Sequence, residues 1–261
     1  MASDEAKGGG AIIETIKTIV YALLIAGIFR TLFFQPFWIP SGSMKETLLI
    51  GDFLFVNKMA YGYSRYSCPF AICPISGRIL GSEPERGDVV VFRHPVTGVD
   101  FIKRVVGMPG ERLQMRGGVL HIDDVPAPQE PAGQFVEVFQ RQGPIGSLPI
   151  CANAGVGLGG ECIKNRFTET LPGGSSHIVL DVRQTALDDT PVYTVPEGHF
   201  FFMGDNRDNS NDSRVMPPNG LGFVPYENLI GRADRVMFSA AGRSLFFFWT
   251  WRSDRFFVAI D

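Results

Sequence analysis

Two serines and one lysine have the residue types and settings of a catalytic group. Ser41 and Ser43 flank a glycine in the turn PSGSMKETL, directly after a run of apolar and aromatic residues, and either hydroxyl is a candidate nucleophile. A serine hydroxyl attacks poorly until a base removes its proton, and a lysine is such a base only when it is uncharged. Because burial among apolar groups lowers the pKa of an amine, the candidate base is a lysine inside an apolar strand. Lys103 in DFIKRVVG is that residue.

The setting of Lys103 also has a purely structural interpretation. Strand alternation places Phe101 and Val105 on the same face as Lys103, which is an apolar environment for an amine. A lysine on an edge strand, where its charge opposes aggregation, has the same pattern. Both interpretations fit the spacing.

Other catalytic groups and metal sites find no support in the sequence. The chain has no GxSxG motif, the nucleophile turn of α/β-hydrolases. The segment GDNRDNSNDS invites a calcium interpretation. With Asp208 as the first ligand, however, Ser213 falls where the EF-hand needs glycine and Asn219 where it needs glutamate. We therefore expect no metal and no cofactor. The histidines, none in a recognisable nucleophile context, are His94, His121, His177 and His199.

The cysteines indicate the compartment of the protein. Cys68, Cys73, Cys151 and Cys162 all follow the apolar N-terminal run, and they do not form the paired CxxC pattern of a zinc site. An even number of cysteines beyond a membrane segment is typical of disulfides in an oxidising compartment. The local pairing, Cys68 with Cys73 and Cys151 with Cys162, costs the least loop closure. Reduced, buried thiols are the alternative.

The segment from Ile12 to Phe34 is apolar enough to be a membrane anchor. As a helix it is roughly 34 Å long, against about 30 Å of bilayer hydrocarbon. Glu14, Lys17 and Arg30 lie near its ends, where long side chains reach the headgroups. An amphipathic helix in the membrane surface is the alternative. A cleaved signal peptide is disfavoured because no small-x-small site follows. We expect one anchor with its N-terminus in the cytoplasm.

The rest of the chain has the composition of a β-rich protein. Its 261 residues carry a net charge of −3, so no basic surface indicates nucleic-acid binding. The 30 glycines and 18 prolines predict short strands and many turns. Strands are expected within residues 48–62, 87–95, 100–113 and from 199 onward, with a hairpin turn at Gly117–Gly118. The tail SLFFFWTWRSDRFFVAID is either a core segment or a contact with lipid headgroups.

Four segments together resemble the conserved boxes of a known enzyme family. PSGSMKETLLIGDFLFVNK, GDVVVFRHP, FIKRVVGMPGE and GDNRDNSNDSR follow the apolar segment in this order and nearly span the chain. In this combination they resemble bacterial type I signal peptidase (leader peptidase), a family of membrane-bound Ser/Lys proteases. The resemblance implies a mostly β fold in which an extended substrate strand docks beside the active site.

The resemblance also implies roles for individual residues. Ser43, which precedes methionine in the SGSM box, corresponds to the nucleophile, and Lys103 of the KR pair to its general base. Ser41 and the backbone N–H of Ser43 correspond to the oxyanion hole, and Ser210 to a serine that orients the lysine amine. The implied supporting charges, expected to form a paired scaffold, are Arg104, Asp205, Asp212 and Arg214. The implied substrate-pocket positions, which core packing could also explain, are Phe37, Ile39, Met44, Leu48 and Ile102.

Two features depart from the family pattern. The family usually has proline three residues after the nucleophile, where this chain has Glu46. Proline would make the turn rigid but has no proton chemistry, so the departure affects local rigidity and substrate preference more than activity. The best-known members have two anchors and this chain has one apparent anchor, as other members do.

The function implied by the resemblance is that of a serine endopeptidase. It would remove signal peptides from exported preproteins after small-x-small sites such as Ala-x-Ala. Its expected location is the bacterial inner (cytoplasmic) membrane, with the catalytic domain on the periplasmic face. Its expected partners are signal peptides, membrane lipid and the protein translocation machinery, with no nucleic acid. The alternatives are a peptidase that matures one dedicated secretion or conjugation partner, and a non-catalytic, membrane-anchored peptide-binding module.

The expected organisation has four parts. Residues 1–34 form the cytoplasmic N-terminus and anchor, residues 35–125 the first part of the catalytic core, residues 126–196 an inserted second β subdomain, and residues 197–261 the second part of the core with the aromatic tail. The inserted part is distinguished by its Pro, Gly and Gln content and its weak periodicity.

Overall fold

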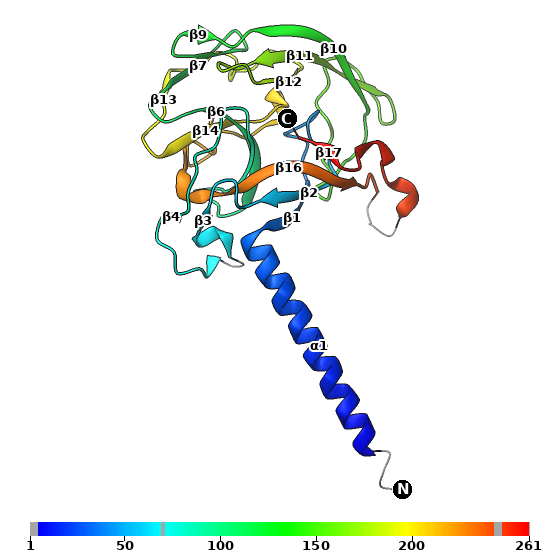
Figure 1. Ribbon diagram of the computed structural model, residues 1–261. Coiled ribbons are helices and arrows are strands. Elements are labelled where there is room, and N and C mark those ends of the chain that lie inside the picture. Colours follow the sequence, from blue (N-terminus) through cyan, green and yellow to red (C-terminus); the bar gives the residue numbers. More distant parts are fainter. Residues whose placement is uncertain (1–4, 69–70, 243–246, 261) are drawn as a thin grey trace.

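The fold is mostly β, as expected, with one long helix. A computed structural model of the chain describes residues 5–68, 71–242 and 247–260. In this part of the chain, helix α1 projects from a body built of strands (Figure 1). Residues 1–4 of the expected cytoplasmic segment, residues 244–246 at the start of the aromatic tail, and the terminal Asp261 lie outside the described residues.

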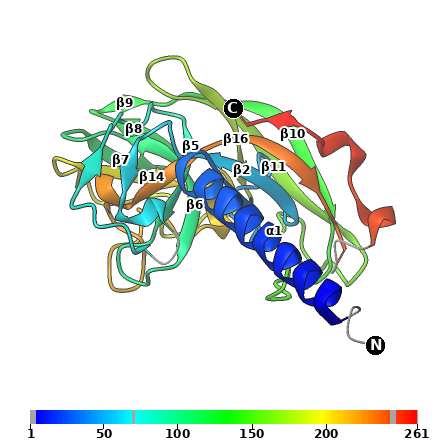
Figure 2. The same ribbon diagram turned by 60° about the horizontal axis from the view of Figure 1, so that its bottom comes forward.

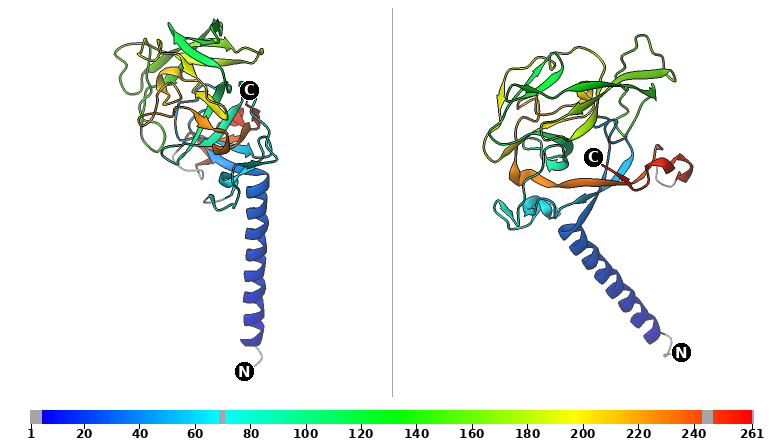
Figure 3. Two further views of the ribbon diagram at one scale, coloured as in Figure 1. Left: turned by 90° about the vertical axis from the view of Figure 1, so that its left-hand side faces the viewer. Right: turned by 45° about the horizontal axis from the view of Figure 1, so that its top comes forward.

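Helix α1, Glu5–Leu32, is long and apolar enough to cross a membrane. Its residues Ile12–Leu32 form a 21-residue segment with a mean hydropathy of 1.9. Apolar side chains such as Leu23 and Ile25 are exposed, because the helix does not pack against the body along its length. Figures 2 and 3 show, from three further directions, that α1 extends away from the body.

The central sheet has eight strands and brings the expected apolar segments together. Its order is β1-β2-β16-β5-β6-β14-β15, and β17 pairs with β16. Val90 and Val91 of β5 and Val105 of β6 are completely buried, which is typical of strands covered on both faces. The strands are β1 Phe34–Trp38, β2 Asp52–Asn57, β5 Val89–Arg93, β6 Asp100–Gly107, β14 His199–Met203, β15 Val224–Pro225, β16 Leu229–Ser239 and β17 Val258–Ala259.

A second sheet of four strands has the order β13-β7-β8-β9. The hairpin between β7 and β8 turns at Gly117 and Gly118, as expected. Both glycines have positive φ, 55° and 80°, which a two-residue type I′ turn requires. The boundary expected at residue 126 falls inside β9, so this sheet combines residues from both sides of it. The strands are β7 Arg112–Arg116, β8 Val119–Ile122, β9 Val125–Pro126 and β13 Tyr193–Thr194.

The expected inserted region contains a third sheet, with the order β10-β11-β12. Its strands are β10 Gln129–Val138, β11 Glu161–Thr170 and β12 Ser176–Asp181. In Figure 1 it lies on the side of the body away from α1. Short elements complete the described chain: β3 Tyr63–Ser64, β4 Arg78–Ile79, and the 3-10 turns η1 Arg65–Ser67, η3 Arg207–Asn209, η4 Tyr226–Asn228, η5 Phe248–Thr250 and η6 Ser253–Arg255.

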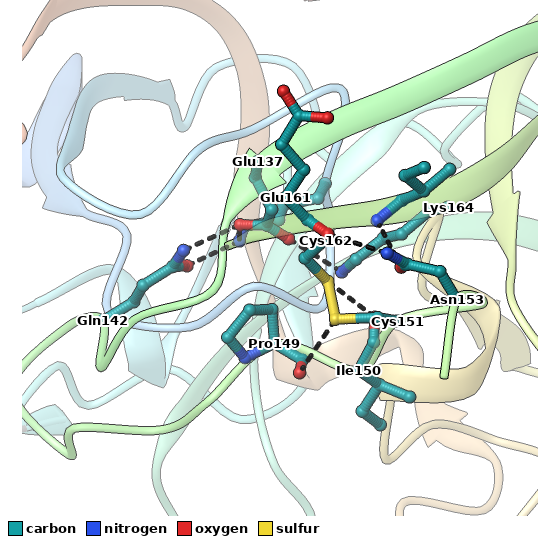
Figure 4. Close-up of a disulfide and its surroundings, with 11 residues drawn as sticks. Glu137, Gln142, Pro149, Ile150, Cys151, Asn153, Glu161, Cys162 and Lys164 are labelled. Carbon is teal, nitrogen blue, oxygen red and sulfur yellow. Dashed lines mark hydrogen bonds and ion pairs between the residues drawn. A yellow bond between two sulfur atoms is a disulfide. The ribbon is translucent and has the colours of Figure 1, made fainter. Parts of the chain in front are cut away.

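The cysteines form two local disulfides in the structure. Cys68 is bonded to Cys73 and Cys151 to Cys162, at sequence separations of 5 and 11 residues. Cys162 lies in β11, and Cys151 lies in the long loop between β10 and β11 (Figure 4). The second disulfide therefore ties this loop to the sheet that it leaves.

The aromatic tail has features of both interpretations. Phe248 and Trp249 are 71% and 68% exposed, so they do not belong to the core. Further along, β17 pairs with β16 and Ile260 packs against the core. The end of the tail is thus part of the central sheet, and its aromatic turn faces solvent.

Removing the Cys151–Cys162 disulfide by double serine substitution is expected to lower the free energy of unfolding by about 2–3 kcal/mol, because the unfolded chain regains the entropy of an open loop. The change is measured by urea unfolding of the full chain in detergent. The matched control is the double serine substitution of Cys68 and Cys73. Their disulfide closes a shorter loop, so its removal should lower the free energy of unfolding less. An equal or larger loss in the control would contradict this account.

Candidate active site

Ser43 and Lys103 meet in the structure. The Lys103 Nζ atom lies 2.6 Å from the Ser43 Oγ atom, a hydrogen-bond distance between groups 60 residues apart in the chain. Ser43 belongs to the turn that follows β1, and Lys103 belongs to β6. Their exposed fractions are 6% and 4%, so the contact is shielded from solvent. The two residue types therefore have the geometry in which an amine can accept a hydroxyl proton.

Burial disfavours the protonated, charged form of the Lys103 amine. Loss of hydration lowers its pKa to about 8, although the carboxylates of Asp212 and Asp205 act in the opposite direction. The amine also donates a hydrogen bond to the Ile102 carbonyl at 3.0 Å. The structure contradicts an aggregation-opposing role for Lys103, because its side chain is buried and does not present its charge to solvent.

Two buried ion pairs surround the site, each joining charges expected to form a scaffold. The Arg104 guanidinium donates to both carboxylate oxygens of Asp205, at 2.9 and 2.8 Å. The Arg214 guanidinium donates to both oxygens of Asp212, at 2.9 and 2.9 Å. Burial alone would raise the pKa of each aspartate, but its arginine outweighs that effect and lowers it. Both carboxylates are thus ionised and already paired, which limits their effect on Lys103.

The Ser41 hydroxyl, one of the two expected oxyanion donors, lies beside the Ser43 hydroxyl. The Ser41 Oγ atom is 3.5 Å from the Ser43 Oγ atom, and Ser41 is exposed where Ser43 is buried. Ser41 is therefore placed to reach a group that approaches Ser43 from solvent.

Asn206 holds the backbone of this turn, a role that the sequence analysis missed. Its backbone N–H donates to the Ser43 carbonyl at 3.0 Å, and its side-chain amide donates to the Gly42 carbonyl at 2.8 Å. The two bonds fix the peptide units on either side of Ser43. Its place in the GDN part of the Asp/Asn-rich box was the signal that could have identified it.

Ser210 comes to the site without contacting the amine. Its Oγ atom is buried, and no hydrogen bond joins it to Lys103 in the described structure; the Ile102 carbonyl is the second acceptor of the amine. A Cβ atom on Gly204 would lie 2.3 Å from the Ser210 Oγ atom and 2.6 Å from the Ser43 carbonyl oxygen. Glycine at position 204 therefore allows Ser210 to pack directly behind the nucleophile turn.

The apolar positions expected around substrate pockets form one cluster beside the two catalytic candidates. Four of the five are buried within it, and Phe37 packs against it while partly exposed. In the described structure, core packing thus accounts for the buried four. The members of this group are Phe37, Ile39, Met44, Leu48 and Ile102.

Two strand edges next to the site lack a partner strand. β1 is the end strand of the central sheet, and β14 pairs with β6 only from Arg104 to Gly107. Residues Asp100–Lys103 of β6 therefore pair on one side only, with β5. The open edge of β6 ends at Lys103, which contacts Ser43, and Ile39, which follows β1, packs in the same cluster as Ile102 of β6. Such open edges can accept an extended peptide by main-chain hydrogen bonds.

A second group of buried charges, also missed from the sequence, lies behind Asp205. The His177 Nε2 atom is 3.5 Å from the Glu169 Oε1 atom and 3.9 Å from the Asp205 Oδ1 atom, and Arg207 pairs with Glu169. Burial, aided by Arg104, lowers the pKa of His177 to about 4, so the imidazole is neutral near pH 7. This group connects β11 and β12 to the Asp205 pair.

A separate cavity of about 700 Å³ is lined by residues that include Arg30, Tyr66 and Asp100, and not by Ser43 or Lys103. The described part of the chain contains no cluster of three or more histidine, cysteine or acidic side chains that could hold a metal ion.

Comparisons with known proteins agree on one family. The family model described as "Signal peptidase, peptidase S26" matches residues 12–238. The signal peptidase I of Rickettsia typhi is 37% identical over 250 residues, covering 92% of this chain and 85% of the relative. That of Rickettsia massiliae is 39% identical over 233 residues, covering 85% and 78%. A solved signal peptidase I from Enterococcus faecalis is 24% identical, covers 58% of this chain and 97% of its own, and superposes with a TM-score of only 0.30, which carries no weight for the fold.

Replacing Asp205 by asparagine is expected to lower the free energy of unfolding by about 3–5 kcal/mol, because it leaves the buried Arg104 guanidinium without a counter-charge. Chemical unfolding of the full chain measures the loss. The control, Asp124→Asn, breaks the exposed pairs with Arg112 and Arg116 and should change stability little. An equal decrease in the free energy of unfolding of the two variants would show that the buried Arg104–Asp205 pair is no more important for stability than an exposed pair.

Proposed function

The chain belongs to the signal peptidase family, peptidase S26, whose members remove signal peptides, and from this premise we propose that it cleaves exported preproteins with Ser43 as nucleophile and Lys103 as general base. The observation that carries the proposal is the 2.6 Å contact between the Ser43 Oγ and Lys103 Nζ atoms in a buried setting. The lowered pKa of the amine supports the assignment, because a base must be unprotonated to act.

Acylation follows from this contact. The uncharged Lys103 amine takes the hydroxyl proton while the Ser43 oxygen attacks the carbonyl carbon of the scissile peptide bond. The negative charge that develops on the carbonyl oxygen is stabilised by the Ser41 hydroxyl and the Ser43 backbone N–H; losing one such donor typically costs about 3–4 kcal/mol. The Lys103 ammonium then protonates the departing amine, and the C–N bond breaks to release the mature protein. The signal peptide stays esterified to Ser43.

Deacylation uses the same amine a second time. Lys103 takes a proton from a water molecule, whose oxygen attacks the ester carbonyl. When the intermediate collapses, the Ser43 oxygen leaves and recovers a proton from the ammonium. The arginine-bound Asp205 and Asp212 do not move protons in this scheme. The Ile102 carbonyl, which accepts a hydrogen bond from the amine at 3.0 Å, orients it toward Ser43, and Ser210 has no hydrogen bond to the amine in the described structure.

The substrate binds in an extended conformation between β1 and residues 100–103 of β6. These edges are open to main-chain hydrogen bonding, and the β6 edge ends at Lys103, which contacts Ser43. We expect small substrate side chains to be selected, because the apolar cluster that includes Met44 and Ile102 is filled by its own buried residues and larger substrate side chains would clash with it. Cleavage after Ala-x-Ala-like sites is the specificity that this arrangement favours.

Helix α1 is the membrane anchor in this proposal. Its 21-residue apolar segment is about 32 Å long as a helix, which matches the hydrocarbon core. The two disulfides favour an oxidising compartment for the body, with the N-terminus in the cytoplasm and the body outside the inner membrane. Sharing the bilayer with the signal segment raises the effective concentration of the cleavage site. Lipid and the translocation machinery are the partners that fit this location.

Ser43→Ala and Lys103→Met are each expected to reduce preprotein cleavage by about three orders of magnitude or more, since neither partner works alone. Gel assays of a preprotein and of an Ala-x-Ala peptide measure the loss. Lys58→Met is the matched control, because Lys58 is also a buried lysine whose burial lowers its pKa to about 8, but its amine donates to the Ser67 carbonyl. Near-normal cleavage by Lys103→Met would contradict the role of Lys103 as general base.

The pH profile of kcat/KM is expected to follow the uncharged form of Lys103. Because burial lowers the pKa of this amine to about 8, cleavage should fall about tenfold per pH unit below that value and level off above it. The profile is measured with a peptide substrate between about pH 5 and 10, a range that extends below and above the pKa of the amine. A profile that stays flat from pH 6 to 9 would show that another group, or no group, acts as the base.

A further inference from the structure

The two residues that follow Met44 both point at the third sheet, β10-β11-β12. The Lys45 amine donates to the Glu137 Oε2 atom at 2.5 Å and to the Gln142 Oε1 atom at 2.6 Å. The next residue, Glu46, forms an ion pair with Arg166, with 2.7 Å between the Oε2 and Nε atoms. A lysine and a glutamate in succession thus bind a glutamate of β10 and an arginine of β11.

The strand register explains why the sheet presents these charges together. Cys162, Lys164 and Arg166 alternate along β11 and share one face, and Glu137 of β10 is opposite Cys162. The Lys164 amine lies 3.0 Å from the Glu137 Oε1 atom, so Glu137 is shared by two lysines. Figure 4 shows Glu137, Gln142 and Lys164 gathered beside the Cys151–Cys162 disulfide, with the Glu161 carboxylate pointing away.

The charges in this contact are complementary and largely removed from water. Lys45 is 4% exposed and Lys164 is completely buried. Burial alone would raise the pKa of Glu137, but Lys164 and Lys45 outweigh it and lower that pKa, so the carboxylate is ionised. Exchanging the signs of Lys45 and Glu46 would place like charges together, which makes the contact specific for this order of residues.

The same turn is held from its other side by Asn206, which binds the carbonyls of Gly42 and Ser43. The loop after β10 also approaches closely: a Cβ atom on Gly143 would lie 2.6 Å from the Pro40 carbonyl oxygen. The nucleophile turn therefore sits between two structures that are far apart in sequence, with polar contacts to each.

We propose that Lys45 and Glu46, bound to Glu137 and Arg166, form an ionic clasp that positions the Ser43 hydroxyl against Lys103. The four are positioning residues and do not touch the reacting atoms. The proposal rests on the function assigned to Ser43 above. It also gives Glu46, which replaces the usual proline of the family, a physical role: where proline would stiffen the turn internally, Glu46 ties it to β11.

The test is a charge exchange at the half-exposed pair, whose side chains are 30% and 29% exposed and can accept substitution. Glu46→Arg and Arg166→Glu are each expected to reduce kcat on the order of tenfold with little change in KM. The Ser43 hydroxyl would lose its alignment for attack, whereas the strand edges that bind the substrate would be unchanged. The double variant restores the ion pair in reverse and should recover most of kcat. Glu161→Arg, the same charge change on the solvent side of β11, is the control and keeps full activity.

A second readout is independent of catalysis. Amide hydrogen exchange of residues 42–48, measured on the full chain in detergent, should accelerate in each single variant and slow again in the double variant, at unchanged melting temperature. Lys45→Met should accelerate the same exchange but also lower the melting temperature, because Glu137 then loses one of its two buried counter-charges. Unchanged exchange and kcat in the singles, or losses that the double variant does not recover, would overturn the clasp. Wild-type protein that fails to cleave a preprotein would overturn the proposed function, while the exchange data would still report on the clasp.

Discussion

The structure is organised around the buried contact between the Lys103 amine and the Ser43 hydroxyl, and the proposed mechanism requires that this amine be uncharged. Lys103 meets this requirement by burial in β6, and burial creates a second requirement, because any unpaired carboxylate nearby would restore the charge of the amine. Asp205 and Asp212 are each bound at both oxygens by an arginine. Each aspartate of the scaffold is therefore neutralised by its own arginine, and the pKa of the Lys103 amine stays lowered, at about 8.

Much of the central sheet was predictable, because its strands have short-range signals. The apolar runs of β5, β6 and β14 and the glycines of the β7–β8 hairpin are local features. The contact between Ser43 and Lys103 was inferred by resemblance, and the geometry that supports it was not in the local pattern. What could not be predicted joins distant segments: Lys45 and Glu137 are 92 residues apart, and Glu137 lies in a region of weak periodicity. The residues that neighbour a charged side chain in the sequence do not identify the opposite charge with which it will pair in the fold.

The nucleophile turn shows why such distant contacts matter. A Ser-Gly-Ser segment has little conformational preference of its own, since glycine permits many backbone conformations. Its geometry is set by groups from outside: Asn206 on one side, and Glu137 with Gln142 on the other. The sheet β10-β11-β12 therefore contributes directly to holding this turn. The disulfide that ties its long loop to β11 lies beside the glutamate that binds Lys45, so folding of this sheet and order in the turn are linked.

The junction of α1 and β1 has a consequence for substrate choice. The helix ends at Leu32 and the edge strand begins at Phe34, with the Phe33 carbonyl accepting from the Lys58 backbone and the Leu32 carbonyl from the Tyr63 hydroxyl. No flexible linker separates the anchor from the strand that leads to Ser43. If α1 spans the bilayer as proposed, this rigid junction fixes the distance of Ser43 from the membrane surface. A precursor would then be measured by the number of residues between its membrane segment and its cleavage site, as well as by the side chains at that site.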